Sequence, residues 1–377
     1  MDISPLAFAL VFALSFANGA NDVSKAVATL VGSGITNYRS AMAWGTVWTV
    51  VGAALAAFVA SAMIKTFSHG LVQTGTIIEP AITLAVLTGA IAWVLFASIT
   101  GLPVSTTHTL TGAIIGTGFV AFAGEGLIWS AIGKKIALPL LLSPFLALAV
   151  SLLIHPAIRA LARKWEGACL CVIPASRALV AIDARGGTRT LLQTTSFGSP
   201  VMAVPSQCDR AGLQGLVVGL DTIHWISSGL ASFARGTNDA PKIVAMLLLG
   251  SATAAWPNTS FQLAAFGGVA LAMGLGSYFG GLRVTEVLAE KVTRMNHAEG
   301  LSANLTTSSL VLVSGALGLP VSTTHVSSSA IIGIGLLKGW NSMRWTTVRD
   351  MVLAWVVTLP ASALLACIAY LILARIL

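Results

Sequence analysis

Two short motifs, each present twice, hold most of the side chains in this sequence that could do chemistry. The first reads NGANDVSK at 18–25 and RGTNDAPK at 235–242. Each copy joins an amide, a carboxylate and an ammonium, and its side-chain oxygens suit Na⁺ or a proton. The polar residues concerned are Asn21, Asp22 and Lys25 in the first copy and Asn238, Asp239 and Lys242 in the second.

The second motif reads GLPVSTTH at 101–108 and again at 318–325. Hydroxyls at the start of a helix lie beside unpaired backbone N–H groups and the positive end of the helix dipole, an arrangement that binds anions and phosphate especially. Simple N-capping by Ser105 or Ser322 is the alternative. The expected anion-binding residues are Ser105, Thr106, Thr107, Ser322, Thr323, Thr324, Asn21 and Asn238.

A cation or proton is expected to couple to the anion through ionisable groups of both motifs. His108 and His325 can either transfer protons or bond a neighbouring carbonyl. If Na⁺ is the coupling ion, Asp22 and Asp239 are its expected ligands. The predicted coupling residues are Asp22, Asp239, Lys25, Lys242, His108 and His325.

Both motifs recur at the same offset of 217 residues, which indicates an internal duplication. The surrounding chain is 56% hydrophobic and 9% charged, with a mean hydropathy of +0.87, whereas about a quarter of the residues in a soluble domain are charged. Apolar runs near the 20 residues that cross a bilayer recur throughout. We therefore expect an all-α polytopic membrane protein with apolar segments at 5–34, 41–63, 82–99, 109–124, 136–155, 212–251, 260–282, 301–318, 326–337 and 351–373.

The expected organisation is a first membrane repeat at 1–155, a central insert at 156–211 and a second membrane repeat at 212–377. Five segments per repeat, an odd number, would give the repeats inverted topologies. The helices are expected to break or re-enter at the motifs, with unwound backbone near Gly19. In the insert, CLCVIPA and LVAIDA suggest short strands and RGG a turn.

Basic residues give the expected orientation. Placing the insert in the cytoplasm puts 14 of the 21 lysines and arginines on that side, as the positive-inside rule requires. The prediction is a multi-pass protein of the cytoplasmic membrane with both termini outside. The first segment lacks the basic n-region of a signal peptide. The net charge of +8 does not indicate nucleic-acid binding, because the basic residues flank apolar segments.

With these motifs in place, the chain resembles the PiT family of inorganic phosphate transporters. GANDVSK and GTNDAPK are similar to the duplicated GANDVAN signature of that family, and both PVSTTH copies match its pattern. The resemblance implies inverted repeats, a central phosphate site, symport with Na⁺ or H⁺, no other cofactor and a homodimer.

The chain departs from the family signature at Lys25 and Lys242, where a small amide is usual. Three explanations are open. The ammonium can occupy the place of a coupling Na⁺, it can bind the oxyanion directly, or it can pair with the Asp three residues before it. The departure leaves both Na⁺ dependence and the choice between phosphate and sulfate open.

Other functions would depend on specific residues of the same motifs. A hydrolase built on Ser105, His108 and Asp22 is not expected, because no GxSxG elbow is present. A passive channel or a divalent-metal carrier is the alternative from another class, and the carrier requires the Asp and His side chains to converge. Asp221 and His224 can form a local pair one turn apart or take part in transport.

Overall fold

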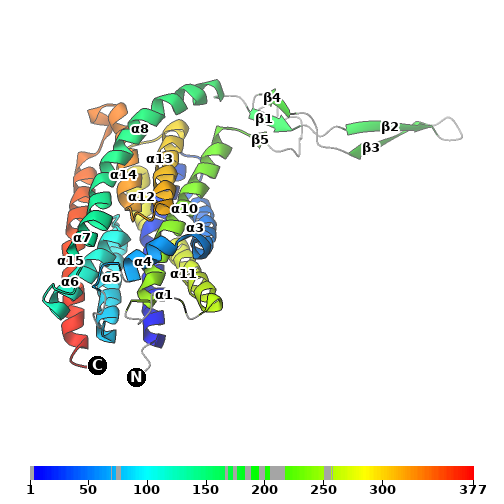
Figure 1. Cartoon of the computed structure of the whole chain (residues 1–377). Helices are drawn as coiled ribbons and strands as arrows, with labels where there is room; N and C mark the ends of the chain where they lie inside the picture. Colours follow the sequence, from blue (N-terminus) through cyan, green and yellow to red (C-terminus); the bar gives the residue numbers. More distant parts are fainter. Residues whose placement is uncertain are drawn as a thin grey trace.

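The computed structural model describes residues 4–68, 70–73, 78–165, 169–172, 176–182, 188–194, 200–203, 217–249, 256 and 258–377. Helices account for most of this chain, and Figure 1 shows them gathered into one bundle. The helices of the first half are α1 Ser4–Asp22, α2 Ser24–Gly32, α3 Tyr38–Val59, α4 Ser61–Ser68, α5 Pro80–Thr100, α6 Thr106–Phe122, α7 Trp129–Ala131, a π-helical turn Ile132–Ala137 and α8 Leu138–Trp165. Those of the second half are α10 Leu220–Val244, a 3-10 turn Ala245–Leu247, α11 Thr259–Gly280, α12 Leu282–Glu290, α13 His297–Ala316, α14 Thr323–Leu337, a 3-10 turn Trp340–Ser342 and α15 Trp345–Leu373.

Over its described residues, each predicted apolar segment coincides with one of these helices or with two in succession, except that Val217–Val218 at the start of 212–251 forms a strand. In the described part of the chain, six helical stretches are long and apolar enough to cross a membrane. The chain is thus a multi-span helical membrane protein, as predicted. Helix α8 continues to Trp165, beyond the boundary expected at 155.

The strands predicted in the central insert are present. Strands β1 Cys169–Val172, β4 Pro200–Ala203 and β5 Val217–Val218 form an antiparallel sheet in the order β4-β1-β5. Strands β2 Ser176–Ile182 and β3 Thr188–Thr194 form a separate antiparallel hairpin. The predicted RGG turn lies outside the described residues. In Figure 1 the strands lie beyond the end of the bundle where α8 ends and α10 begins; we call this the strand end and the opposite one the terminus end.

Two helical hairpins carry the GLPVSTTH motifs at their tips. Helices α5 and α6 are joined through Gly101, and α13 and α14 through Gly318, and both glycines have positive φ, 77° and 67°. The first hairpin opens toward the terminus end and the second toward the strand end (Figure 1). In the second, Lys338 just after α14 bonds Glu299 in the first turn of α13 at 3.0 Å. Because the two hairpins open toward opposite ends, their tips point toward each other inside the bundle.

The helices that carry the Asn-Asp motifs are less disrupted than the sequence suggested. In the first copy α1 runs through Gly19 to Asp22, and a single residue, Val23, separates it from α2. In the second copy α10 runs unbroken through the whole motif to Val244. The expectation of unwound backbone at Gly19 was wrong, because this glycine serves close helix packing instead.

Glycines allow the two halves to approach at van der Waals distance. A Cβ added to Gly19 would lie 2.1 Å from the Met273 carbonyl oxygen of α11, and one added to Gly236 would lie 2.5 Å from that of Thr49 in α3. Gly276 lies against the Phe16 carbonyl in the same way, at 1.9 Å from an added Cβ. Each motif helix thus packs closely against a helix of the other half, α1 against α11 and α10 against α3.

This packing predicts that Gly276→Ala destabilises the protein whereas Gly267→Ala, in the same helix, does not. A Cβ at Gly267 has nothing within 4 Å, and alanine favours a helix over glycine by about 1 kcal/mol. Overpacking at Gly276 costs about 1–3 kcal/mol. Thermal unfolding of the two variants in detergent is the measurement. Equal melting temperatures would contradict the close approach.

Candidate functional site

The first Asn-Asp motif forms hydrogen bonds with the segment that leads into α6. Lys25 forms an ion pair with Asp22, and its Nζ also donates to the Val104 carbonyl at 3.0 Å. Asn21 accepts a hydrogen bond from Val104 N at 3.1 Å and donates to the Leu102 carbonyl at 2.9 Å. The motif therefore fixes the backbone just ahead of the hydroxyl run.

The second motif makes a parallel set of contacts at the other hairpin tip. Lys242 Nζ lies 3.1 Å from the Asp239 carboxylate and 3.3 Å from the Val321 carbonyl. Asn238 donates to the same carbonyl at 3.4 Å. Lys242 also donates to Thr107 of the first hairpin at 2.7 Å. Both lysines thus pair with the aspartate three residues before them, one of the three explanations that the sequence left open.

The two hairpin tips exchange hydrogen bonds. The Thr107 hydroxyl donates to the Val321 carbonyl at 3.2 Å, and the Thr324 hydroxyl donates to the Val104 carbonyl at 2.6 Å. Residues 217 positions apart therefore make the same contact in opposite directions. This exchange brings both STTH runs and both Asn-Asp motifs to one place at the centre of the molecule.

The remaining hydroxyls of the STTH runs have distinct positions. Ser105 accepts from His108 N at 3.3 Å and Ser322 accepts from His325 N at 3.1 Å. Both serines are thus N-caps, and their role in binding an anion stays a prediction. Thr106 accepts from Asn18 at 2.8 Å, and the Thr323 hydroxyl lies 3.5 Å from Asp22 Oδ2.

The sequence reasoning missed two residues at the site, Asn18 and Arg235. They occupy equivalent positions, 217 residues apart, immediately before the glycine of each motif copy. Asn18 Nδ2 donates to Asp22 at 3.2 Å and lies 3.5 Å from Asp239 Oδ2. Comparing FANG with FARG at this offset would have identified both.

Arg235 is fully buried and only partly bonded. Its Nη2 donates to Thr49 at 2.5 Å and to Ser277 at 3.2 Å, while its Nε and Nη1 have no partner among the described residues. These two nitrogens are unpartnered donors in the plane of the guanidinium, and a bound anion would offer each of them an oxygen acceptor.

The site holds one more positive group than negative groups. Five ionisable side chains expose at most 2% of their surface each. Three of them are cationic and two are carboxylates, so the cluster has a net charge of +1 when all are ionised. A buried charge without a counter-charge is costly, and a bound anion would remove that cost. The five are Asp22, Lys25, Arg235, Asp239 and Lys242.

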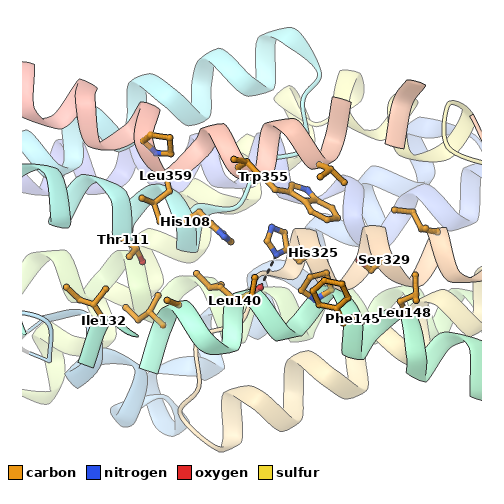
Figure 2. Close-up of a pocket in the computed structure, with 18 of the residues that line it drawn as sticks. His108, Thr111, Ile132, Leu140, Phe145, Leu148, His325, Ser329, Trp355 and Leu359 are labelled. Atoms are coloured by element: carbon orange, nitrogen blue, oxygen red, sulfur yellow. Dashed lines mark hydrogen bonds between the residues drawn. The ribbon is translucent and has the colours of Figure 1, made fainter. Parts of the chain in front are cut away.

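The two motif histidines point away from this cluster. Their rings lie 4.6 Å apart, and the His325 ring also lies 4.3 Å from Trp355. His325 Nδ1 bonds the Leu140 carbonyl at 3.2 Å, whereas His108 Nδ1 has no partner in the described chain. Figure 2 shows both rings at a mainly apolar cavity of about 860 Å³ between α6, α8, α14 and α15.

The histidines therefore do not converge with the aspartates. Among the described residues, no group of three or more His, Cys, Asp or Glu side chains could hold a metal ion. The convergence that a divalent-metal carrier requires is not present. Asp221 and His224 do not pair either, because Asp221 bonds His297 at 2.5 Å.

Comparison with known proteins supports the reading of the motifs. A protein of Pyrococcus horikoshii described as a phosphate permease is 28% identical over 96% of this chain and 95% of its own. A protein of Mycobacterium tuberculosis described as a probable low-affinity inorganic phosphate transporter is 28% identical over 95% of this chain and 74% of its own. The solved structure titled "The sodium-dependent phosphate transporter" superposes with a TM-score of 0.76 at 22% identity, covering 100% of both chains.

The match to the phosphate transporter family model extends over residues 18–366 and so includes all four motif copies and the insert between them. The duplicated motifs, the hairpins that carry them and the buried cluster where they meet all fall within the matched range. The chain belongs to the phosphate transporter family.

Proposed function

We propose that this phosphate transporter is a cation-coupled symporter that binds its substrate at the meeting point of the two hairpin tips. The observation that carries the proposal is the crossed exchange between Thr107 and Val321 and between Thr324 and Val104. It sets two helix starts face to face, beside both Asn-Asp motifs. Helix starts bind anions, so two of them surround one tetrahedral anion.

Charge and hydrogen bonding support an anion at this place. The cluster has its excess positive charge, and Arg235 offers two unpartnered donors. Asp22 lies beside the start of α14, because the hydroxyl of Thr323, the first residue of that helix, is 3.5 Å from Asp22 Oδ2. An ionised Asp beside the anion favours phosphate over sulfate, because a protonated phosphate can donate to it and sulfate cannot. Thr106, Thr107, Thr323 and Thr324 are the expected substrate-contacting hydroxyls.

The lysines occupy positions suited to a coupling cation. Lys25 Nζ contacts a carboxylate and a backbone carbonyl, and carbonyl and carboxylate oxygens are what coordinate Na⁺ in membrane transporters. We propose that the ammonium of Lys25, with that of Lys242, replaces a coupling Na⁺ and that transport is linked to H⁺. Direct binding of the anion by the ammonium is the competing role, and the uptake measurements below distinguish the two.

The topology fits inverted repeats. Helix α1 starts at the terminus end and α10 at the strand end (Figure 1). In each half one hairpin, α5–α6 or α13–α14, returns toward the side from which it started. We propose that 1–155 and 212–377 are inverted repeats around a central insert at 156–211, and that the protein forms a homodimer in the cytoplasmic membrane.

The basic residues suggest the orientation. Arg159 and Arg163 lie at the end of α8 and Lys338 just after α14, all at the strand end, whereas Lys65 and Arg375 belong to the other side. By the positive-inside rule the strand end is cytoplasmic and both termini are outside.

Uptake of radiolabelled phosphate into proteoliposomes is expected under an imposed pH gradient and to saturate. Excess unlabelled phosphate should compete strongly, and excess sulfate weakly. Absence of uptake under both a pH gradient and a Na⁺ gradient would contradict symport, and equal competition by sulfate would contradict the role given to Asp22.

Arg235→Gln is expected to weaken phosphate binding about ten- to a hundredfold, since a hydrogen bond to a charged group contributes about 1.5–3 kcal/mol. The phosphate affinity of Arg235→Lys should lie between those of Arg235→Gln and the wild type, because lysine keeps the positive charge and loses the planar set of N–H donors. Exposed Arg375→Gln is the control. Binding is measured as phosphate-dependent thermal stabilisation in detergent. Unchanged affinity in Arg235→Gln would remove Arg235 from the site.

Lys25→Asn combined with Lys242→Asn is expected to make the protein respond to Na⁺. Removing each ammonium leaves a buried carboxylate unpaired, which destabilises by about 3–5 kcal/mol, and Na⁺ bound in its place restores stability by mass action. The melting temperature of the double variant should rise with Na⁺ but not with choline. Wild type and exposed Lys65→Asn should show no such rise, and phosphate uptake by the double variant should become driven by Na⁺.

A further inference from the structure

One face of α10 is polar along the whole helix, from the strand end to the central site. Its polar residues recur at steps of three or four, so they stack on one side of a helix with 3.6 residues per turn. The stripe begins at exposed Asp221 and ends in the buried Asp239–Lys242 pair. Its members are Asp221, His224, Ser228, Ser232, Arg235, Asp239 and Lys242.

Hydrogen bonds join Ser228 of this stripe to α2, and its neighbour Ser227 to α13. Asn304 of α13 donates to Ser227 at 3.3 Å, and Thr29 of α2 donates to Asn304 Oδ1 at 3.1 Å. Ser228 donates to the carbonyl of Ala26 at 2.9 Å, and Ala26 directly follows Lys25. Buried polar groups therefore form a continuous ladder between three helices, from near the strand end down to the site.

The ladder is incompletely satisfied. His224 is 0% exposed, and neither of its ring nitrogens has a hydrogen-bond partner among the described residues. Its ring lies against Gly300 of α13, where an added Cβ would be 2.3 Å from the ring. The Ser232 hydroxyl is likewise buried without a partner. Buried polar groups are normally bonded to protein or to water, so these groups point to a state in which water or a hydrated solute reaches them.

Several of the equivalent positions in the first half are apolar, although Ser232 corresponds to a serine, Ser15. Subtracting 217 converts His224, Ser227 and Ser228 into Ala7, Leu10 and Val11, and it converts Asn304 into Leu87. In the reverse direction, adding 217 to Thr29 of the first half gives Met246 in the second half. Val11, Leu87 and Met246 are buried together in the largest hydrophobic cluster, between the site and the terminus end.

We propose that this polar ladder is the half of the transport route that opens to the strand end, and that the apolar cluster is the gate of the opposite half. The proposal rests on the transport function proposed above. Equivalent backbone positions thus carry polar side chains in the strand-end half of the route and apolar side chains in the terminus-end half. Opening toward the strand end hydrates groups that are unsatisfied when closed, whereas opening toward the terminus end exposes apolar side chains to water. Without substrate, the strand-end half is therefore expected to open more readily than the terminus-end half.

Cysteine accessibility tests this asymmetry with matched pairs. In a background with Cys169, Cys171, Cys208 and Cys367 replaced by serine, Ser228→Cys is compared with Val11→Cys, and Asn304→Cys with Leu87→Cys. All four positions are buried here, so reaction with a membrane-impermeant methanethiosulfonate reports opening. Asn341→Cys and Arg375→Cys, both exposed, report which end of the reconstituted protein faces the reagent.

Without phosphate, Ser228→Cys and Asn304→Cys are expected to react from the strand end at least tenfold faster than their partners react from the terminus end. Comparable rates for both members of each pair, or reaction of Ser228→Cys from the terminus end alone, would overturn the proposal. The labelling pattern requires no phosphate transport, so it fails or succeeds independently of the uptake measurements.

His224→Leu provides a second measurement. If His224 is unsatisfied in the closed form and hydrated in the open form, an apolar side chain of similar size favours closure. The melting temperature without phosphate should rise, and labelling of Ser228→Cys in the same chain should slow at least threefold. A lower melting temperature with unchanged labelling would show that His224 serves the fold alone and would overturn its place in the route.

Discussion

The carbonyl groups of Val104 and Val321 hold the centre of this protein together. Each accepts a hydrogen bond from the lysine of its own half and another from the threonine of the opposite half. A carbonyl oxygen has two lone pairs, so both are used at each place, and Val321 takes a third, longer contact from Asn238 at 3.4 Å. Because the same two atoms join the hairpin tips and the ion pairs, neither can move without changing the bonding of the other.

This double use links the charges to the shape of the site. Lys25 cannot leave Val104 without freeing a carbonyl that Thr324 also holds, and a lost buried partner costs about 1–3 kcal/mol. Ionised Asp22 and Asp239 keep the lysines in place, and Arg235 contributes the positive charge that the two ion pairs do not cancel. Any change of charge at the cluster therefore alters contacts that lie between the two halves.

The sequence predicted the elements and the meeting of the motifs better than it predicted the backbone at the motifs. Long apolar runs and a shared offset of 217 are global signals, and α1 to α15 follow them closely. The expected unwinding at Gly19 failed because a glycine in a membrane helix serves close packing as readily as a break, and only the position of α11 distinguishes the two. Ser105 and Ser322 have two possible roles that depend on the same local geometry, and the structure shows the cap while the anion-binding role stays a prediction.

The residues that the sequence analysis overlooked lie where the two halves differ. Asn18 and Arg235 are equivalent in position and unlike in charge, and His224 is a buried histidine where the first half has Ala7. A duplicated protein needs equal halves to form one central site from two sets of residues. It needs unequal halves to hold a single charge there and to open more readily to one side. In the function we propose, the equal positions therefore form the site, and the unequal ones, Arg235 and His224 among them, give it its net charge and its preferred direction of opening.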